Sequence, residues 1–197
     1  RDPFAKAERA KDDNVVSLPD LGREPAADGS RRPDAARPDA ATGEPASLVE
    51  QGIQQIRRVD SDFNPKEFLI GARAAFEMIL NAFAAGDKAT LKGLLSPEVH
   101  GNFVHAIDDR QKAGQTLEDT LVGIKSAEVV EAFLEGRVAH VTIKFVSEQI
   151  TVTRDAEGQI VDGNPNTVTE VTDFWTFGRD TRSRDPNWDL VATRSLD

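Results

Sequence analysis

The chain has 197 residues, 39% of them hydrophobic, and a formal net charge of −10 at pH 7. That balance is typical of one soluble globular domain joined to a less ordered segment, and the acidic excess argues against a nucleic-acid partner, because phosphate binding needs a basic face. With no cysteine and three histidines, disulfides, thiolate metal sites and cysteine nucleophiles are excluded. We therefore predict a protein without a metal ion or a cofactor.

No window of the sequence approaches the ~18 apolar residues that span a bilayer, and no signal peptide is visible. The chain begins at Arg1 and not at a methionine. We therefore expect a fragment of a longer protein, from which an N-terminal membrane anchor is absent.

Residues 1–46 are predicted to form a disordered tail or linker rich in Pro, Ala, Asp and Arg. Beyond Phe4, the large apolar residues of this segment are Val15, Val16, Leu18 and Leu21. A segment with so little apolar surface to bury cannot offset the entropy that it loses on folding. The folded domain is expected to comprise residues 47–197.

The first predicted helix covers Ser47–Arg58 and is amphipathic. Its apolar positions have helical spacing: Leu48, Val49, Ile53 and Ile56. Arg57 and Arg58 lie at its C-terminal end, where positive charge suits the helix dipole. Two interpretations stay open: the helix docks on the rest of the domain, or it binds a membrane surface or a partner.

Three further helices are predicted before residue 114. Asn64-Pro65 supplies an N-cap and a proline at the first helical position, and Gly86 ends the helix that follows. Its apolar face recurs at spacings of three and four: Phe68, Ala72, Phe76, Ile79 and Phe83. Asp87 is expected to cap a short helix, and Ser96-Pro97 starts another that ends at Gly114; its inward residues are Val99, Phe103 and Ile107.

After Thr116 the hydrophobic period becomes that of strands. Ile124–Leu134 is a candidate first strand, and 139–145 alternates apolar and polar side chains, which indicates one buried face. The apolar phase shifts near Ser147, so a β-bulge is expected there. Beyond it, Ile150 and Val152 continue on the other parity.

Turn signals at 155–158 and 163–166 precede an alternating strand over Val171–Phe177. Asp185-Pro186-Asn187 then turns the chain into a last strand with Trp188, Leu190 and Ala192. Helices followed by strands predict an α+β fold, with the N-terminal helices packed on one face of a four-stranded antiparallel sheet.

The sequence offers few candidates for catalysis or metal binding. His100 and His105 lie five residues apart, roughly 140° around a helix, so they do not converge on one metal ion. His140 falls opposite the apolar face of its strand and is expected to be exposed. No glycine-rich phosphate loop or nucleophile elbow is present, and we predict no catalytic residue.

Asp173 is the exception, because it shares the parity of Val171, Trp175 and Phe177. A carboxylate that faces the apolar side of a sheet would have a raised pKa and could act as a general base. The alternative is that backbone amides or an arginine such as Arg179 satisfy it, or that it lies at the rim of the sheet.

Many of these positions together resemble the Tim44-like family, the C-terminal domain of the forty-four-kilodalton subunit of the mitochondrial inner-membrane import translocase. The resemblance covers about Ser47–Thr193 and is strongest in the closing block with two tryptophans. The residues that carry it are Phe68, Gly71-Ala72, Phe76, Ala82-Phe83-Ala84, Gly86-Asp87, Leu91, Leu94-Leu95-Ser96, Phe145, Ser147, Glu148, Val171, Asp173, Trp175-Thr176-Phe177, Arg179, Asp185-Pro186-Asn187-Trp188, Leu190 and Ala192-Thr193. The Asp/Ala/Arg-rich tail looks more like the alphaproteobacterial branch.

The resemblance implies a cystatin-like cone, related to nuclear transport factor two, in which helices and a curved sheet enclose an apolar pocket. It implies a non-enzymatic protein of the bacterial inner membrane that binds anionic, cardiolipin-like lipid or a partner protein and is linked to protein translocation. In mitochondria the protein tethers a seventy-kilodalton chaperone to the channel, but the tail here does not match the chaperone-binding region. A mitochondrial ribosomal protein shares the domain.

Two surfaces follow as expected sites. The residues expected to contact lipid are Leu48, Ile53, Ile56, Arg57 and Arg58. The residues expected to line an apolar pocket are Phe76, Phe83, Phe103, Ile107, Phe145, Trp175 and Phe177, with ordinary core packing as the alternative. Two other functions remain open: an isomerase or dehydratase of the cone type that uses Asp173, and a soluble adaptor or ribosome-associated protein.

Overall fold

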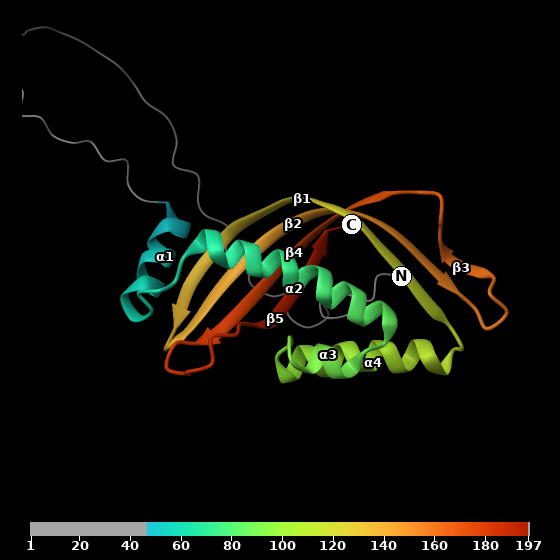
Figure 1. The fold of residues 1–197 in the computed structure, drawn as a ribbon, viewed down its shortest axis with the longest axis horizontal. Helices are drawn as coiled ribbons and strands as arrows, with labels where there is room; N and C mark the ends of the chain where they lie inside the picture. Colours follow the sequence, from blue (N-terminus) through green and yellow to red (C-terminus); the bar gives the residue numbers. More distant parts are fainter. Residues whose placement is uncertain (1–46, 197) are drawn as a thin grey trace, which may run out of the picture.

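The computed structural model describes residues 47–196, in which helices come first and strands follow (Figure 1). The predicted tail, residues 1–46, lies outside the described part of the chain. The helices are α1 (Leu48–Val59), α2 (Pro65–Ala85), α3 (Lys88–Lys92) and α4 (Pro97–Lys112). The strands are β1 (Thr116–Glu135), β2 (Val138–Arg154), β3 (Ile160–Gly163), β4 (Thr169–Asp180) and β5 (Asp189–Leu196).

The strands form one antiparallel sheet in the order β1-β2-β4-β5. This is the predicted meander, and the α+β class is confirmed. Two details differ: β1 begins at Thr116 and not at Ile124, and the short β3 pairs with the end of β2 through Val152 and Gly163. The sequence predicts only the turns on either side of β3, because a four-residue strand has too few positions to show an alternation.

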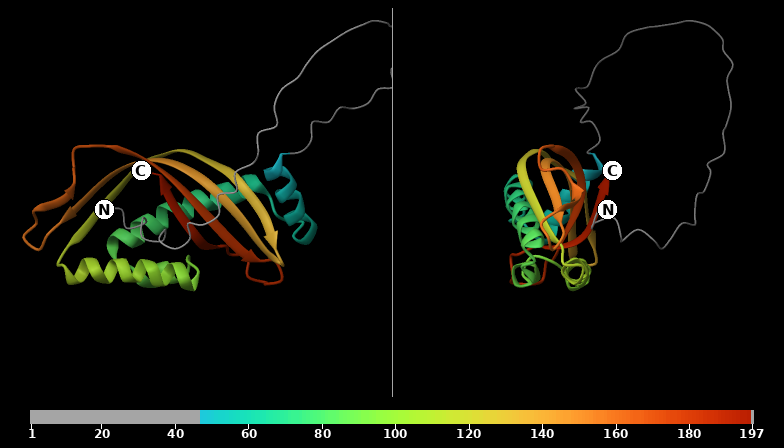
Figure 2. Two further views of the ribbon diagram at one scale, coloured as in Figure 1. Left: turned by 180° about the vertical axis from the view of Figure 1, so that it is seen from behind. Right: turned by 90° about the vertical axis from the view of Figure 1, so that its right-hand side faces the viewer.

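The sheet is curved, and its irregularities lie in β1. The pairing with β2 shifts register between Leu121 and Gly123, between Ile124 and Ser126, and between Val129 and Glu131. Each shift leaves one extra residue in β1, namely Val122, Lys125 and Val130. Because an extra residue bends and twists the strand that carries it, these bulges favour the arch seen in Figures 1 and 2.

The bulge predicted near Ser147 in β2 is wrong. β2 pairs with β4 in one continuous register from Val138 to Gln149. The buried parity continues through two polar side chains, because the Gln149 Nε2 donates a 2.9 Å hydrogen bond to the Ser147 Oγ. A polar pair that satisfies itself can take inward positions. The buried parity changes only beyond Gln149, where Val152 is buried, and the bulges opposite this stretch lie in β1.

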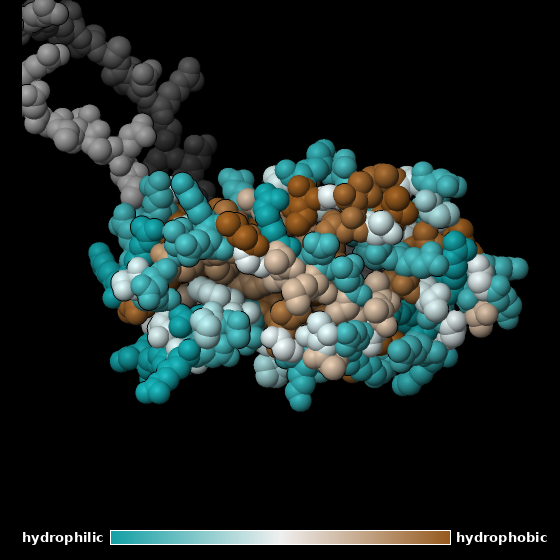
Figure 3. All heavy atoms as spheres, viewed as in Figure 1, coloured by the Kyte–Doolittle hydropathy of each residue, from teal (hydrophilic) through white to brown (hydrophobic). Residues whose placement is uncertain are grey.

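The helices lie against the concave side of the arch, with α2 along the sheet and α3 and α4 beneath it (Figures 1 and 2). The inward residues of β2 and β4 meet those of α2 and α4 in one core, as expected for a two-layer α+β domain. The predicted inward residues of α2 and α4 are buried, except Phe68, which is partly buried at the edge of the core. Polar residues cover most of the face in Figure 3, while apolar residues gather along its upper margin.

The helix boundaries follow the predicted capping signals. The Asn64 side chain accepts a hydrogen bond from the Lys66 N–H, and Ser96 does the same for Val99. Gly86 ends α2 with φ +72°, in the left-handed region that glycine adopts without a steric penalty. The Arg110 guanidinium then donates to the carbonyls of Phe83 and Ala84, which ties α4 to the end of α2.

α2 is long and apolar enough to cross a membrane by length and composition. The prediction that no segment of the chain is long and apolar enough to span a bilayer is therefore wrong. The helix also supplies Phe76, Ile79 and Phe83 to the core. A buried core helix passes the same test, so the feature has a structural explanation within the domain.

α1 approaches the edge of the sheet at one glycine. Gly52 is buried, and a Cβ added there would overlap the carbonyl oxygen of Ala132 in β1. Ile56, one turn later, is fully buried in the core. A glycine is therefore needed for α1 to dock on β1 at this distance.

Replacing Gly52 with alanine is expected to lower the free energy of unfolding by about 1–3 kcal/mol, because the helix must move away from β1. Urea unfolding followed by circular dichroism measures the change. Gly71→Ala is the matched control: Gly71 is exposed in α2 with no atom near its missing Cβ, so alanine there should stabilise by about 0.5–1 kcal/mol. Equal effects at the two positions would contradict the close approach.

Candidate functional site

The seven residues predicted to line an apolar pocket all lie in the hydrophobic core. Phe76 of α2 stacks on Phe145 of β2 at 4.4 Å between ring centroids, and lies 4.5 Å from Trp175 of β4. Phe83 and Phe103 make an edge contact at 5.3 Å. The structure thus brings these residues together ring against ring, as close core packing does. A ligand between them stays a prediction.

Asp173 points inward, as its parity predicted, and its side chain is only 4% exposed. It pairs in register with Phe145, and the hydroxyl of Ser195 in β5 donates a hydrogen bond to its Oδ1. Arg179 does not reach it; that arginine pairs with Asp60 instead. The hydroxyl contact shows that the carboxylate has a structural partner across the sheet.

The residues predicted to contact lipid divide between the two sides of α1. Leu48 is 84% exposed, and Arg57 and Arg58 are exposed as well. Ile56 is fully buried and Ile53 packs against the core. Neither isoleucine lies on the outer surface, because the apolar face of α1 is used to dock on β1. Of the two interpretations of this helix, the structure agrees with docking on the rest of the domain.

An ion pair holds the C-terminal end of α1. The Arg179 Nη1 lies 2.8 Å from the Asp60 Oδ2, and both side chains are largely buried. The same guanidinium donates to the carbonyls of Ser183 and Asp185 in the loop before β5. A planar guanidinium with several donors suits such a junction. The contact joins the end of α1 to the closing segment of the chain.

Trp188 of that segment packs beside the junction. Its ring lies 4.8 Å from Phe68 and 5.7 Å from Phe63. Trp188 precedes β5, and Ala192 of the predicted last strand is exposed, because the register between β4 and β5 shifts at Val191. The alternation predicted through Leu190 therefore stops at this bulge.

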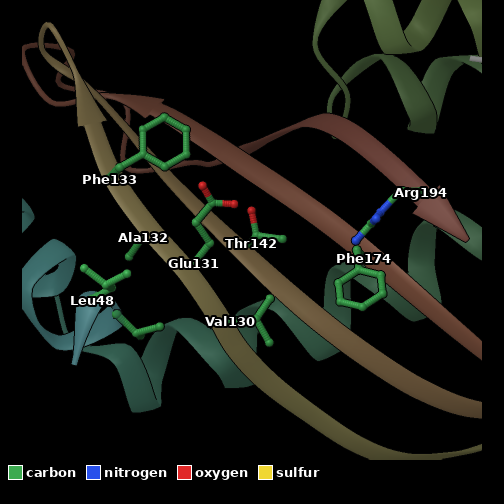
Figure 4. Close-up of a pocket in the computed structure, with 9 residues that line it drawn as sticks. Leu48, Val130, Glu131, Ala132, Phe133, Thr142, Phe174 and Arg194 are labelled. Atoms are coloured by element: carbon green, nitrogen blue, oxygen red, sulfur yellow. The ribbon is translucent and has the colours of Figure 1, made fainter. Parts of the chain in front are cut away.

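An open groove runs between α1 and the outer face of the sheet (Figure 4). We call it the α1 groove; its lining residues are Leu48, Val49, Val130, Glu131, Ala132, Phe133, Thr142, Phe174 and Arg194. The Arg194 guanidinium lies 4.5 Å from the centre of the Phe174 ring, a cation–π contact. Sequence reasoning missed the groove, because it depends on the bulges that set which residues face outward.

His140 was predicted to be exposed and is instead half-buried. Its ring stacks on Phe133 at 4.7 Å, and its Nδ1 is buried without a hydrogen-bond partner among residues 47–196. The other histidines lie on the helices: the His100 Nε2 is 3.2 Å from the Lys88 carbonyl oxygen, and His105 pairs with Asp109 at 3.4 Å. Within the described chain, no group of three or more potential ligands is placed to hold a metal ion.

Asp119 is an ionisable residue that sequence reasoning did not select. It lies in β1 between Leu117 and Leu121, which pack against the core. Burial raises the pKa of its carboxyl from 3.8 to about 6, while a hydrogen bond from Thr151 lowers it. Its signal in the sequence was the parity of β1, which the predicted start at Ile124 left out.

The raised pKa predicts how stability depends on pH. Because the folded pKa of Asp119 exceeds the unfolded value, its contribution is complete below about pH 4 and is lost as pH rises through about 6. Asp119→Asn should therefore stabilise the protein at pH 7 by on the order of 1–2 kcal/mol and have little effect at pH 4. Urea unfolding across this range measures the difference from the parent, and Glu128→Gln, exposed in the same strand, is the control. A gain independent of pH would contradict the assignment.

The model of the Tim44-like domain matches residues 49–195, which are nearly all of the described chain. Among curated proteins, the chain is 27% identical over 124 residues to the mitochondrial import inner membrane translocase subunit TIM44-1 of Arabidopsis thaliana, covering 63% of this chain and 26% of that protein. It is 22% identical over 150 residues to TIM44 of Homo sapiens, covering 76% and 32%. It is also 25% identical over 142 residues to the large ribosomal subunit protein mL45 of Drosophila melanogaster, covering 70% and 39%.

The chain thus spans between a quarter and two fifths of the length of these relatives. The matched region begins in α1 and ends in β5, so it contains every described helix and strand. Helices over a curved antiparallel sheet form the cone, related to nuclear transport factor two, that the resemblance implied. On the extent of this match, the chain belongs to the Tim44-like domain family.

Proposed function

We propose that this domain is a non-enzymatic binding module that associates with the bacterial inner membrane and takes part in protein translocation. The similarity to translocase subunits supports the role in translocation. That support extends only to the part of those proteins that this chain matches. The observation that supports membrane contact is an exposed stripe on α1, described next.

Exposed residues at both ends of α1 combine apolar and basic character. Leu48 and Val59 lie eleven positions apart, which places them on one side of a helix with 3.6 residues per turn, at the margin of the face that docks through Gly52; they are 84% and 51% exposed. Arg58 lies about a quarter turn around the helix from them and is exposed. Such a stripe suits a helix lying flat on a lipid surface, with apolar side chains inserted shallowly and arginine at the anionic headgroups.

The charges around this stripe favour a weak, salt-dependent contact. Each basic residue near an anionic membrane contributes about 1 kcal/mol, and Arg57 lies at the other margin of the helix with its Nε bonded to the Phe63 carbonyl. Asp60 would repel anionic lipid, but the ion pair with Arg179 compensates its charge. Glu50 caps the start of α1 and remains an opposing charge.

Liposome flotation tests the proposal with the full chain and vesicles of phosphatidylcholine with or without cardiolipin. We expect binding only to the anionic vesicles at low salt. Replacing Arg57 and Arg58 together with serine should weaken it about tenfold or more, and Leu48→Ser should weaken it further. The matched control replaces Lys92 and Lys112, exposed on α3 and α4 away from α1, which removes the same charge.

Loss of flotation in both double variants would reduce the contact to a general charge effect. Absence of flotation by the parent chain at low salt would exclude lipid binding by this domain. Substitution is a sharper test than removal of α1, because removal would uncover the core around Ile56.

A soluble adaptor that binds a ribosome is the second candidate, and the similarity to mL45 favours it. Its discriminating result is co-sedimentation with ribosomes that survives the arginine substitutions. The enzyme alternative rests on Asp173, which is buried beside Phe145 and bonded to Ser195. Asp173 and Ser195 do not line the α1 groove, and the contacts of Asp173 support a structural role.

A further inference from the structure

The α1 groove is an apolar surface beside the point where the described chain begins. Leu48 and Val49, in the first turn of α1, form one wall, and Val130 and Phe174 of the sheet lie across from them (Figure 4). Leu48 is 84% exposed and Val130 is also exposed. An apolar side chain entering the groove would remove these residues from water, a favourable transfer.

Two charged side chains line the groove, Glu131 and Arg194, and the cationic one is available to an acidic residue of an incoming chain. Arg194 lies over the Phe174 ring and forms no ion pair with any residue in 47–196. Its charge lies at the edge of an apolar surface. The groove therefore fits an apolar segment that carries an acidic residue.

The sequence before the domain contains such a segment. Apart from Phe4, the large apolar residues of 1–46 are confined to Val15–Leu21, and Asp12, Asp13 and Asp20 accompany them. Residues 22–46 separate it from the domain, and a flexible chain of that length would have a root-mean-square span of about 25–30 Å and a reach of ~80 Å when extended. They end at Ser47, the N-cap of α1.

We propose that Val15–Leu21 docks in the α1 groove of its own chain, with its apolar side chains against Val130 and Phe174 and an aspartate near Arg194. Tethering supplies an effective concentration on the order of millimolar, so a contact too weak to form between separate molecules is populated within one chain. Because Leu48 is covered in the docked state, the segment competes with any ligand of the outer side of α1.

Paramagnetic relaxation in the full chain tests this docking. The protein has no cysteine, so Asn14→Cys places a single nitroxide label next to the segment. We expect loss of amide signal intensity at Val130, Phe174 and Arg194, while signals of α4 are retained. Replacing Val16 and Leu18 with serine should restore the intensities.

A label at Ser30→Cys is the matched control. It lies nearer to Ser47 in sequence, so tethering without docking would broaden the groove signals more from Ser30 than from Asn14. That order, or no loss from Asn14, would overturn the proposal. A mixing experiment combines isotopically labelled chain that lacks the nitroxide with nitroxide-labelled chain of natural isotopic abundance. If the groove signals lose intensity in this mixture, the segment docks on a second copy, which would also overturn the proposal.

The consequence for lipid rests on the proposed function and is separable from it. If both hold, the Val16 and Leu18 serine variant, which leaves the net charge unchanged, should bind anionic vesicles more tightly than the parent. If the relaxation experiment shows docking but the chain does not float with vesicles, the docking is upheld and the lipid contact is rejected. If the chain floats but the relaxation experiment shows no docking, the lipid contact is upheld and the docking is rejected.

Discussion

The curvature of the sheet is the constraint on which the rest of the domain depends. Each of the three extra residues in β1 bends the strand, because it faces no partner in β2. The concave side that results holds α2 and the ring contacts of Phe76, Phe145 and Trp175. The last bulge, at Val130, lies two residues before Ala132, where α1 docks. Core, groove and docked helix thus follow from one irregular strand.

Docking also decides what α1 can do. An isolated amphipathic helix would offer its whole apolar face to a membrane. Here that face packs against the sheet and the core through Gly52 and Ile56. The exposed apolar and basic residues of α1 are Leu48 and Val59 near its ends and the two arginines, beside exposed Glu50 and glutamines, so any surface contact is weak and depends on charge. A weak contact is one that a tethered segment or a protein partner can displace, which suits a regulated module better than a permanent anchor.

Two pairs of polar residues on the inner face are satisfied within the sheet, whereas the Trp175 Nε1 is buried without a hydrogen-bond partner among residues 47–196. Ser147 bonds to Gln149, and Ser195 bonds to Asp173. Paired polar groups cost far less than isolated ones in an apolar interior. Asp119 is the contrasting case, because burial raises its pKa against a single long hydrogen bond from Thr151. These contacts give the buried polar groups near the centre a structural explanation.

Local sequence signals were sufficient for the elements that depend on neighbours along the chain. The caps at Asn64 and Ser96 and the stop at Gly86 fixed the helices, because capping is settled within one turn, and alternation in β2 and β4 fixed the inward face, Asp173 included. Tertiary structure alone decided the bulges of β1, the burial of Ile56 and the groove beside Leu48. Those features depend on which strand lies opposite and which helix face finds a partner, and no periodicity within one segment records that.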